Sequence, residues 1–403
     1  MRITRLRVKN FKSIRDAEIN FPPMTLVVGA NAAGKSNFVS VFKFLSDLLS
    51  RGLEAAIALQ GGIEWLVNAN LPKGTPVEIA FTMNVDRIGY DDDDGFYTEE
   101  NYYQLKYDLR IVPNKRGNGY KIGHDELILT VDQGVEELYK RNKSGYINYK
   151  YKFKNLKEKE WKFYLAESPV KKILEKPENQ KEAIFHFLPF MISSSSQDEF
   201  IRVFDFDPRI LKRPSPIESV PELTEDGSNL ANVLRNILRS KKKQEELTAL
   251  LNDFLPFVEK VDVDSNADKS FSYKIRENYS KKAFHENFLS DGTVSILAIL
   301  TALYFQEKAN IVILEEPERN LHPRLLSKLL SAAEDVSAKK QIILTTHNPE
   351  FLKHAKIEHV LFISRDDEGF TVFQSPKDSQ TVRAFMENDL GMDDLFLQDM
   401  LGA

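Results

Sequence analysis

Apolar and polar residues alternate at the start of the chain. Over residues 2–9 apolar side chains alternate with Arg and Lys, and the alternation returns over 17–21. A period of two is that of a strand with one buried face. The pattern therefore predicts an antiparallel pair of strands at the N-terminus.

Farther along, short apolar runs alternate with helical patterns. Such runs are typical of strands buried on both faces, and their alternation with helices predicts a parallel sheet covered by helical layers. We expect strands at 25–29, 77–85, 258–264, 271–277, 311–316, 341–347 and 360–365. We expect helices at 36–49, 291–306 and 323–338, and at 226–238 with an Asp or Ser cap and a helical continuation to about 255.

The middle of the chain has a different composition. From about 88 to 210 it contains an acidic loop, many aromatic residues and a basic stretch. We expect an α+β insertion over 88–210. The predicted organisation is an α/β head formed by 1–87 and 211–403 and interrupted by that insertion.

Composition narrows the class of protein. The 403 residues include 55 Lys and Arg against 60 Asp and Glu, so the surface as a whole is not a general nucleic-acid binder. The absence of cysteine excludes disulfides, thiolate metal sites and cysteine nucleophiles. The apolar run 295–305 is shorter than the roughly 20 residues of a membrane span, and the basic, alternating start is no signal peptide. We expect a soluble, cytoplasmic protein without a membrane partner.

The segment 29–36 has the spacing G-x-x-x-x-G-K-S of a phosphate-binding loop. Its glycines let successive N–H groups and the following helix N-terminus face a phosphate. Lys35 would reach the β- and γ-phosphates of ATP, and the Ser36 hydroxyl would hold Mg²⁺. We predict a nucleotide site made by Gly29, Asn31, Ala32, Ala33, Gly34, Lys35, Ser36 and Asn37. The alternative is a Gly-rich turn without a ligand.

Two adjacent carboxylates end the apolar strand 311–316. Acids at the carboxyl end of a parallel strand lie where ligands bind, so we expect Glu315 in the Mg²⁺ shell and Glu316 beside the attacking water. His347 ends the strand 341–347, and neighbouring strands of one sheet would bring it towards the phosphates. The alternatives are a solvated strand end for the acids and a structural or exposed histidine.

The segment Leu289-Ser290-Asp291-Gly292-Thr293 begins a predicted helix. Ser290 and Gly292 would offer a hydroxyl and backbone donors to a second anion site at the helix N-terminus. An ordinary helix cap is the alternative.

These four motifs, in this order, resemble those of the ABC class of ATPases, specifically the heads of RecF, SMC and OLD-like proteins. The opening RLRVKNFKSIRDAEINF is similar to the first hairpin of that group. The segments DGSNL, LSDGT, EEPE followed by LHP, and THNP are similar to those of stand-alone bacterial predicted AAA-family ATPases. The resemblance covers about 1–85 and 226–403, and implies an ABC-type head with a mixed sheet, an N-terminal antiparallel hairpin and a parallel P-loop core.

The resemblance also implies roles for these residues. Lys35 and Ser36 would bind nucleotide and Mg²⁺, Glu315 would take the Walker B acid position, Glu316 would be the catalytic base, and His347 the switch histidine. Ser290 and Gly292 would act in trans on ATP held by a second subunit, with Asn320 to Pro323 in the D-loop, which makes the active unit a homodimer. The chain departs from the pattern of this class at two points. Glu315 stands where the Walker B motif usually has Asp, and the Q-loop glutamine is not securely placed, with Gln60 only a guess.

We therefore expect an ATP-hydrolysing molecular switch that regulates a partner effector or a DNA or RNA transaction, as in anti-phage defence or DNA repair. The alternatives are an ATP-binding scaffold with little turnover and a transporter's nucleotide-binding subunit. In the insertion, Tyr149, Tyr151 and Phe153 alternate with Lys150, Lys152 and Lys154. As a strand, this segment would have one aromatic and one basic face, which could bind a nucleic-acid backbone or an acidic partner. The alternative is an ordinary amphipathic strand with aromatic residues in the core and lysines in solvent.

Overall fold

The computed structural model describes most of the chain and divides it into two compact units. The residues described are 1–85, 88–91, 97–100, 102–115, 119–131, 135–141, 147–153, 182–187, 200–217 and 222–376. The first unit comprises Met1–Pro22, Ser36–Ile201 and Ser364–Phe373, and the second Pro23–Lys35, Arg202–Ile363 and Gln374–Ala403.

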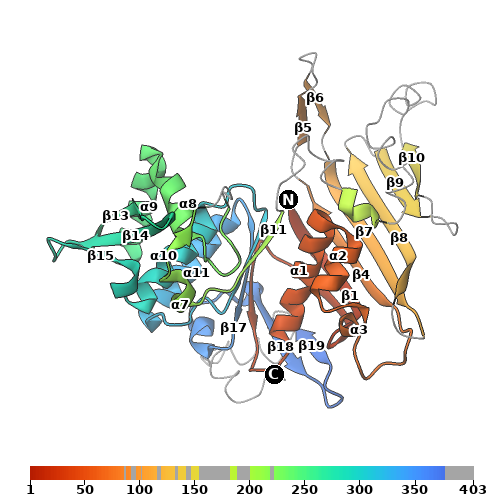
Figure 1. The fold of residues 1–403 in the computed structure, drawn as a ribbon. Coiled ribbons are helices and arrows are strands. Elements are labelled where there is room, and N and C mark those ends of the chain that lie inside the picture. The colour runs from red at the N-terminus through yellow and green to blue at the C-terminus, as the bar shows by residue number, and fades with distance from the viewer. Residues whose placement is uncertain are drawn as a thin grey trace. The chain divides into compact units, whose positions relative to one another are not determined.

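The first unit is built on a seven-stranded antiparallel sheet (Figure 1). Its strand order is β10–β9–β8–β7–β4–β1–β2. The strands are β1 (Arg2–Phe11), β2 (Ile14–Asn20), β4 (Val77–Asn84), β7 (Tyr102–Pro113), β8 (Tyr120–Val131), β9 (Val135–Arg141) and β10 (Ile147–Phe153). A separate pair is β5 (Ile88–Asp91) with β6 (Tyr97–Glu100). The predicted N-terminal hairpin and the strand at 77–85 are confirmed.

Helices cover one face of this sheet. They are α1 (Lys35–Arg51), α2 (Leu53–Leu59), α3 (Ile63–Leu66) and the 3₁₀ turn η3 (Ile184–Phe187). Phe11 of β1 contacts Phe44 of α1 edge to face, with ring centroids 6.0 Å apart. The buried positions of β1 alternate with exposed ones, as the period of two predicts. The apolar face of the hairpin therefore packs against α1.

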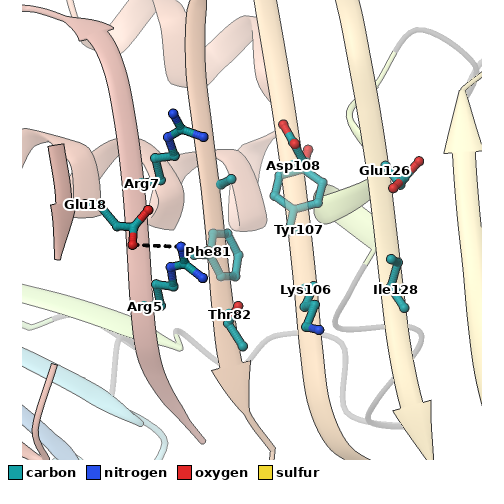
Figure 2. Close-up of a pocket in the computed structure, with 11 residues that line it drawn as sticks. Arg5, Arg7, Glu18, Phe81, Thr82, Lys106, Tyr107, Asp108, Glu126 and Ile128 are labelled. Carbon is teal, nitrogen blue, oxygen red and sulfur yellow. Dashed lines mark ion pairs between the residues drawn. The ribbon is translucent and has the colours of Figure 1, made fainter. Parts of the chain in front are cut away.

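The other face of the sheet is polar. Figure 2 shows charged side chains of both signs on neighbouring strands around a shallow cavity of about 300 Å³, with Arg5 bound to Glu18 at 2.7 Å. The charges balance locally, so this face is not a basic surface. Since β7 to β10 continue the sheet begun by β1, β2 and β4, the boundary predicted at residue 87 falls within one sheet. The predicted division into head and insertion stays a prediction.

The predicted parallel sheet has the strand order β11–β16–β17–β3–β18–β19, and its parallel strands β3, β16, β17 and most of β18 belong to the second unit. Strands β16, β17, β3 and β18 pair in parallel. The strands are β3 (Met24–Val28), β11 (Ile201–Phe204), β16 (Ile311–Glu315), β17 (Gln341–Thr346), β18 (Val360–Arg365) and β19 (Thr371–Gln374). The α-helices α10 (Asp291–Tyr304) and α11 (Leu326–Ser337) lie where the sequence predicts them, and α10 is buried on all sides from Thr293 to Leu303. The 3₁₀ turns are η5 (Pro323–Leu325), η6 (Pro349–Lys353) and η7 (Ile357–His359).

A smaller sheet with its own helices completes the second unit. It consists of β12 (Ser215–Pro216), β13 (Val258–Ser265), β14 (Ser270–Glu277) and β15 (Ala283–His285), followed by η4 (Glu286–Phe288). The helices are α7 (Pro208–Leu211), α8 (Leu230–Leu238) and α9 (Lys241–Phe254). The predicted strands at 258–264 and 271–277 are confirmed.

The helix predicted to start at 226 begins at Leu230 instead. Asp226 does not cap it, because its carboxylate accepts hydrogen bonds from the Ser228 N–H and the Thr224 hydroxyl, both at 3.0 Å, and so closes a turn. The expected continuous helix to 255 is also interrupted, since Ser240 caps a new helix, α9, through the Lys243 N–H. In the described part of the chain, no helix is both long and apolar enough to span a bilayer.

Candidate functional site

The loop 29–34 joins β3 to α1, and two of its residues have positive φ angles. Gly34 has φ +112° and Ala32 φ +66°. The Gly29 N–H donates to the Thr346 carbonyl at 3.2 Å, and a Cβ on Gly29 would lie 2.4 Å from the Ile363 carbonyl. The first glycine is thus required because two neighbouring strands approach its backbone closely.

Lys35 folds back into this loop. Its Nζ donates to the carbonyls of Gly29 at 2.8 Å and Ala30 at 3.1 Å, and lies 3.6 Å from Oε1 of Glu316. Burial lowers the pKa of Lys35, and the nearby Glu316 carboxylate opposes that effect. The ammonium group is therefore held in the loop by two carbonyl oxygens and a carboxylate oxygen.

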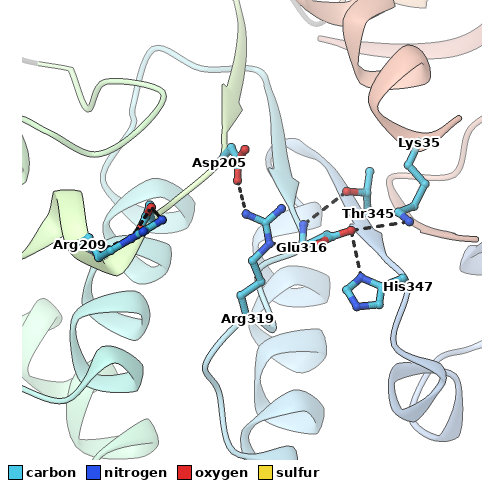
Figure 3. A network of polar contacts seen from close by, with 8 residues as sticks. Lys35, Asp205, Arg209, Glu316, Arg319, Thr345 and His347 are labelled. Carbon is cyan, nitrogen blue, oxygen red and sulfur yellow. Dashed lines mark hydrogen bonds and ion pairs between the residues drawn. The ribbon is translucent and has the colours of Figure 1, made fainter. Parts of the chain in front are cut away.

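Glu316 lies at the centre of the polar network in Figure 3. Its Oε1 lies 3.0 Å from Nδ1 of His347, and its Oε2 accepts a hydrogen bond from Nε of Arg319 at 3.0 Å. Its N–H donates to the Thr345 carbonyl at 2.9 Å, and its φ is +44°. Burial raises the pKa of Glu316, but the hydrogen bonds from His347 and Arg319 outweigh it and hold this pKa below its usual range. The carboxylate is thus kept ionised.

The motifs converge because they follow neighbouring strands of one parallel sheet. The loop follows β3, Glu316 follows β16 and His347 follows β17, and β17 lies between the other two. The carboxyl ends of parallel strands meet at one edge, where ligands of such sheets bind. The structure therefore brings Lys35, Glu316 and His347 together as the sequence predicts.

Two residues of this network were missed from sequence. Nη1 of Arg319 donates to Asp205 at 2.8 Å, and Asp205 directly follows β11, the neighbour of β16 (Figure 3). The available signal was the short run IRVF ending in an acid, the same pattern as at β16.

The remaining predicted loop residues differ in exposure. Asn31, Ala32 and Ser36 are exposed, and Ala33 is buried with its N–H bound to the Ala30 carbonyl at 3.2 Å. Asn37 donates from Nδ2 to the Ser13 hydroxyl at 2.6 Å. Asn37 thus ties α1 to the N-terminal hairpin, a role that the sequence did not indicate.

The oxygen donors expected around Mg²⁺ suit that ion. Glu315, the last residue of β16, is half-buried, and Ser36 is in the first turn of α1. Mg²⁺ prefers hard oxygen ligands and is usually held by one or two protein groups together with substrate phosphates. The Ser36 hydroxyl and the Glu315 carboxylate are oxygen donors of this kind, and their role at Mg²⁺ stays a prediction.

Ser290 and Gly292 begin helix α10. The Ser290 hydroxyl accepts from the Thr293 N–H at 3.1 Å, which makes Ser290 the helix cap. A Cβ on Gly292 would lie 3.0 Å from the carbonyl of Asn320, whose φ is +65°. The expected cap is present, and any action of these residues on a second subunit stays a prediction.

Gln60 lies elsewhere in the first unit, at the end of α2. It lines a cavity of about 780 Å³ together with Lys12 and Trp65, whose side chain is 72% exposed. Its assignment as the Q-loop glutamine stays a prediction. The residues Tyr149 to Phe153 form most of β10, which confirms the predicted strand, and Lys154 lies outside the described residues.

Solved structures share this fold. An SmcHead bound to the C-winged helix domain of ScpA is 15% identical, with a TM-score of 0.53 over 93% of this chain and 98% of that chain. An Smc head domain with an extended coiled coil, bound to the C-terminal domain of ScpA derived from Pyrococcus furiosus, is also 15% identical, with a TM-score of 0.51 over 96% and 99%. At these identities the likeness shows the fold alone.

Sequence comparisons connect the chain to AAA proteins. Septu protein PtuA of Bacillus thuringiensis is 23% identical over 119 residues, which are 28% of each chain, so the match spans less than a third of that relative. The family model "AAA ATPase domain" matches residues 1–52, and the model "AAA domain, putative AbiEii toxin, Type IV TA system" matches 137–353, more than half of the chain. The chain therefore belongs to the family described as "AAA domain, putative AbiEii toxin, Type IV TA system", with the fold of an SMC-type P-loop ATPase head.

Proposed function

We propose that this protein binds and hydrolyses ATP at the loop 29–36. The observation that carries the proposal is the contact of Glu316 with both Lys35 and His347, at 3.6 Å and 3.0 Å, where three neighbouring strands end. A loop lysine beside an ionised carboxylate and an imidazole is a set that can hold a phosphate and take a proton from water. Membership in an AAA family supports it.

Each residue then has a defined task. Lys35 and the N–H groups of the loop would hold the phosphates, and Ser36 and Glu315 would hold Mg²⁺, which stabilises phosphate charge when bound. Glu316 would accept the proton of the attacking water, and His347 would orient Glu316 through their hydrogen bond. Lys35 and Arg319 both contact Glu316, and a bound phosphate would compete with Glu316 for Lys35.

We further propose that ATP binding joins two copies of this chain and controls a partner effector, in a setting such as bacterial defence. The family description names a toxin–antitoxin system, and both solved SMC heads bind a partner protein, ScpA. The similarity to Septu protein PtuA supports the same class of function.

Two substitutions with matched controls test the chemistry. Lys35→Ala should abolish tight ATP binding in calorimetry, because the loop loses its only side-chain cation. Glu316→Gln should bind ATP normally but release phosphate at least about 100-fold more slowly, since an amide cannot take the proton. Lys260→Ala and Glu259→Gln change a half-buried and an exposed residue of β13, outside the site, and should leave both readouts unchanged. Normal affinity in the first variant or normal turnover in the second would contradict the proposal.

An ATP-binding scaffold with little turnover is the second candidate. Glu315 favours it, because it stands where the resemblance expects Asp and its longer side chain changes the metal geometry. Calorimetry on the unsubstituted protein would then show ATP binding while phosphate release stays at background.

A further inference from the structure

A second acid of the EEPE segment, Glu318, is buried beside the site and has no assigned task. Glu318 is 7% exposed, and it lies within the turn closed by the hydrogen bond from the Arg319 N–H to the Glu316 carbonyl at 3.1 Å. One carboxylate oxygen, Oε1, accepts a hydrogen bond from the hydroxyl of Thr346. The other, Oε2, is buried and has no hydrogen-bond partner among the residues that the structure describes.

Thr346 connects this carboxylate to His347. The Thr346 hydroxyl accepts from the Asn348 N–H at 2.9 Å, so its own proton is directed to Glu318. The hydrogen bond from the Asn348 N–H to this hydroxyl spans His347, which lies between Thr346 and Asn348 in the chain. The hydrogen bond from the hydroxyl to Glu318 anchors that turn. Thr346 is fully buried, and its carbonyl receives the N–H of Gly29. Glu318 therefore holds the turn that carries the histidine against the turn that carries Glu316.

The cost of this arrangement indicates a function. A buried carboxylate with one unpaired oxygen is expensive, and burial raises the pKa of Glu318. Simple packing between the two turns could be supplied by an apolar side chain without that cost. The Glu318 carboxylate, by contrast, is a hydrogen-bond acceptor that fixes the orientation of the Thr346 hydroxyl. That hydroxyl in turn fixes the conformation of the turn at His347.

We propose that Glu318 is a positioning residue, which through Thr346 sets the contact between His347 and Glu316. The inference rests on the proposed ATPase function for its effect on turnover, but the contact between His347 and Glu316 can be followed independently of turnover. Glu318 does not touch the reacting atoms in this assignment; it fixes the geometry of the residues that do. Its removal should therefore change the rate of hydrolysis more than the affinity for ATP.

The test uses the full chain and the nearly isosteric pair Thr346→Val and Thr346→Ser. Thr346→Val removes the hydroxyl and should shift the imidazole NMR signals of His347, measured without added nucleotide. These signals are assigned to His347 because they are missing from the spectrum of His347→Gln. Thr346→Val should also lower kcat for ATP by about tenfold, with ATP affinity within about threefold of the unsubstituted protein. Thr346→Ser keeps the hydroxyl and should restore both readouts. Glu318→Leu should reproduce Thr346→Val, and the double variant should lose no more than the larger single loss.

The outcomes separate the two proposals. An unmoved His347 signal in a folded Thr346→Val protein, or a Thr346→Ser protein that behaves like Thr346→Val, would overturn the positioning role. If Glu318→Leu does not fold, the Thr346 pair decides alone. A shifted signal in a protein that never hydrolyses ATP would support the positioning role and overturn the proposed function instead.

Discussion

At the scale of single residues, Glu316 combines backbone strain with a dense set of partners. A non-glycine residue at φ +44° is unfavourable by roughly 1–3 kcal/mol, and such residues gather at functional sites. Here the strain aims the carboxylate at Lys35 and His347 while the N–H stays bound to Thr345. Local sequence rules do not predict that conformation, because the hydrogen bond that stabilises it comes from Thr345 of the neighbouring strand β17.

The pH dependence of turnover should report this environment. Because hydrogen bonds hold the pKa of Glu316 below its usual range, the base stays ionised at pH values where a free Glu is partly protonated. Turnover should therefore fall only as the pH drops below about 4.3. His347→Ala removes a hydrogen bond that lowers this pKa, so the acid limb should move to higher pH.

The measurement is kcat against pH, with circular dichroism at each pH to verify folding. His359→Ala, outside the network, serves as the control and should leave the acid limb in place. An acid limb at the same pH in His347→Ala and in the unsubstituted protein would show that the histidine does not tune the base.

At the scale of elements, the sequence predicted the buried parallel strands well and the antiparallel ones less completely. The apolar run of β16 is buried up to Leu314 and β17 is buried along its whole length, so composition alone indicates these strands. Strands β7 and β8 mix charged and apolar residues, and their pairing depends on distant partners. For the same reason the sequence did not indicate the roles of Asp205 and Thr346, which arise from contacts with residues that follow another strand.

One such contact should stabilise the antiparallel sheet. Asp125 of β8 is fully buried, where it accepts hydrogen bonds from the Tyr107 hydroxyl at 3.0 Å, Arg141 at 3.1 Å and the Ile184 N–H at 3.1 Å. Asp125→Ala removes a buried counter-charge of Arg141 and the acceptor of these hydrogen bonds, and should lower the free energy of unfolding by about 3–5 kcal/mol. The midpoint of urea unfolding measures this.

Two further variants make the measurement specific. Asp16→Ala, in an exposed ion pair with Lys9, should cost less than about 1 kcal/mol. Burial raises the pKa of Asp125 to about 6, so Asp125 is ionised above that pH and neutral below it. Because this folded-state pKa lies above the value of about 3.9 for a free Asp, ionisation of Asp125 favours the unfolded chain. Asp125→Asn mimics the neutral acid and cannot ionise, so its stability deficit should shrink as the pH rises from about 4 to above 6. A deficit independent of pH would contradict this assignment of the charge.

At the scale of the whole molecule, the proposal requires two copies of the chain. Ser290 caps α10, is exposed, and belongs to the segment that the resemblance places on a second subunit's ATP. Gly292 lies in the same segment, where the Asn320 carbonyl approaches its backbone closely. The requirement for a second copy can be tested by combining two inactive proteins.

Ser290→Arg should leave ATP binding by one subunit intact but block hydrolysis, because a bulky cation would enter the shared interface. Lys35→Ala blocks ATP binding at the subunit's own loop. When the two proteins are mixed, each heterodimer would contain one composite site with both defects and one with neither. Phosphate release should therefore recover partly in the mixture, reaching a maximum near equal amounts. No recovery at any ratio would indicate either a monomeric ATPase or a dimer whose two sites must act together. Size-exclusion chromatography in the presence of ATP distinguishes these cases, because only the dimer would elute as a heterodimer.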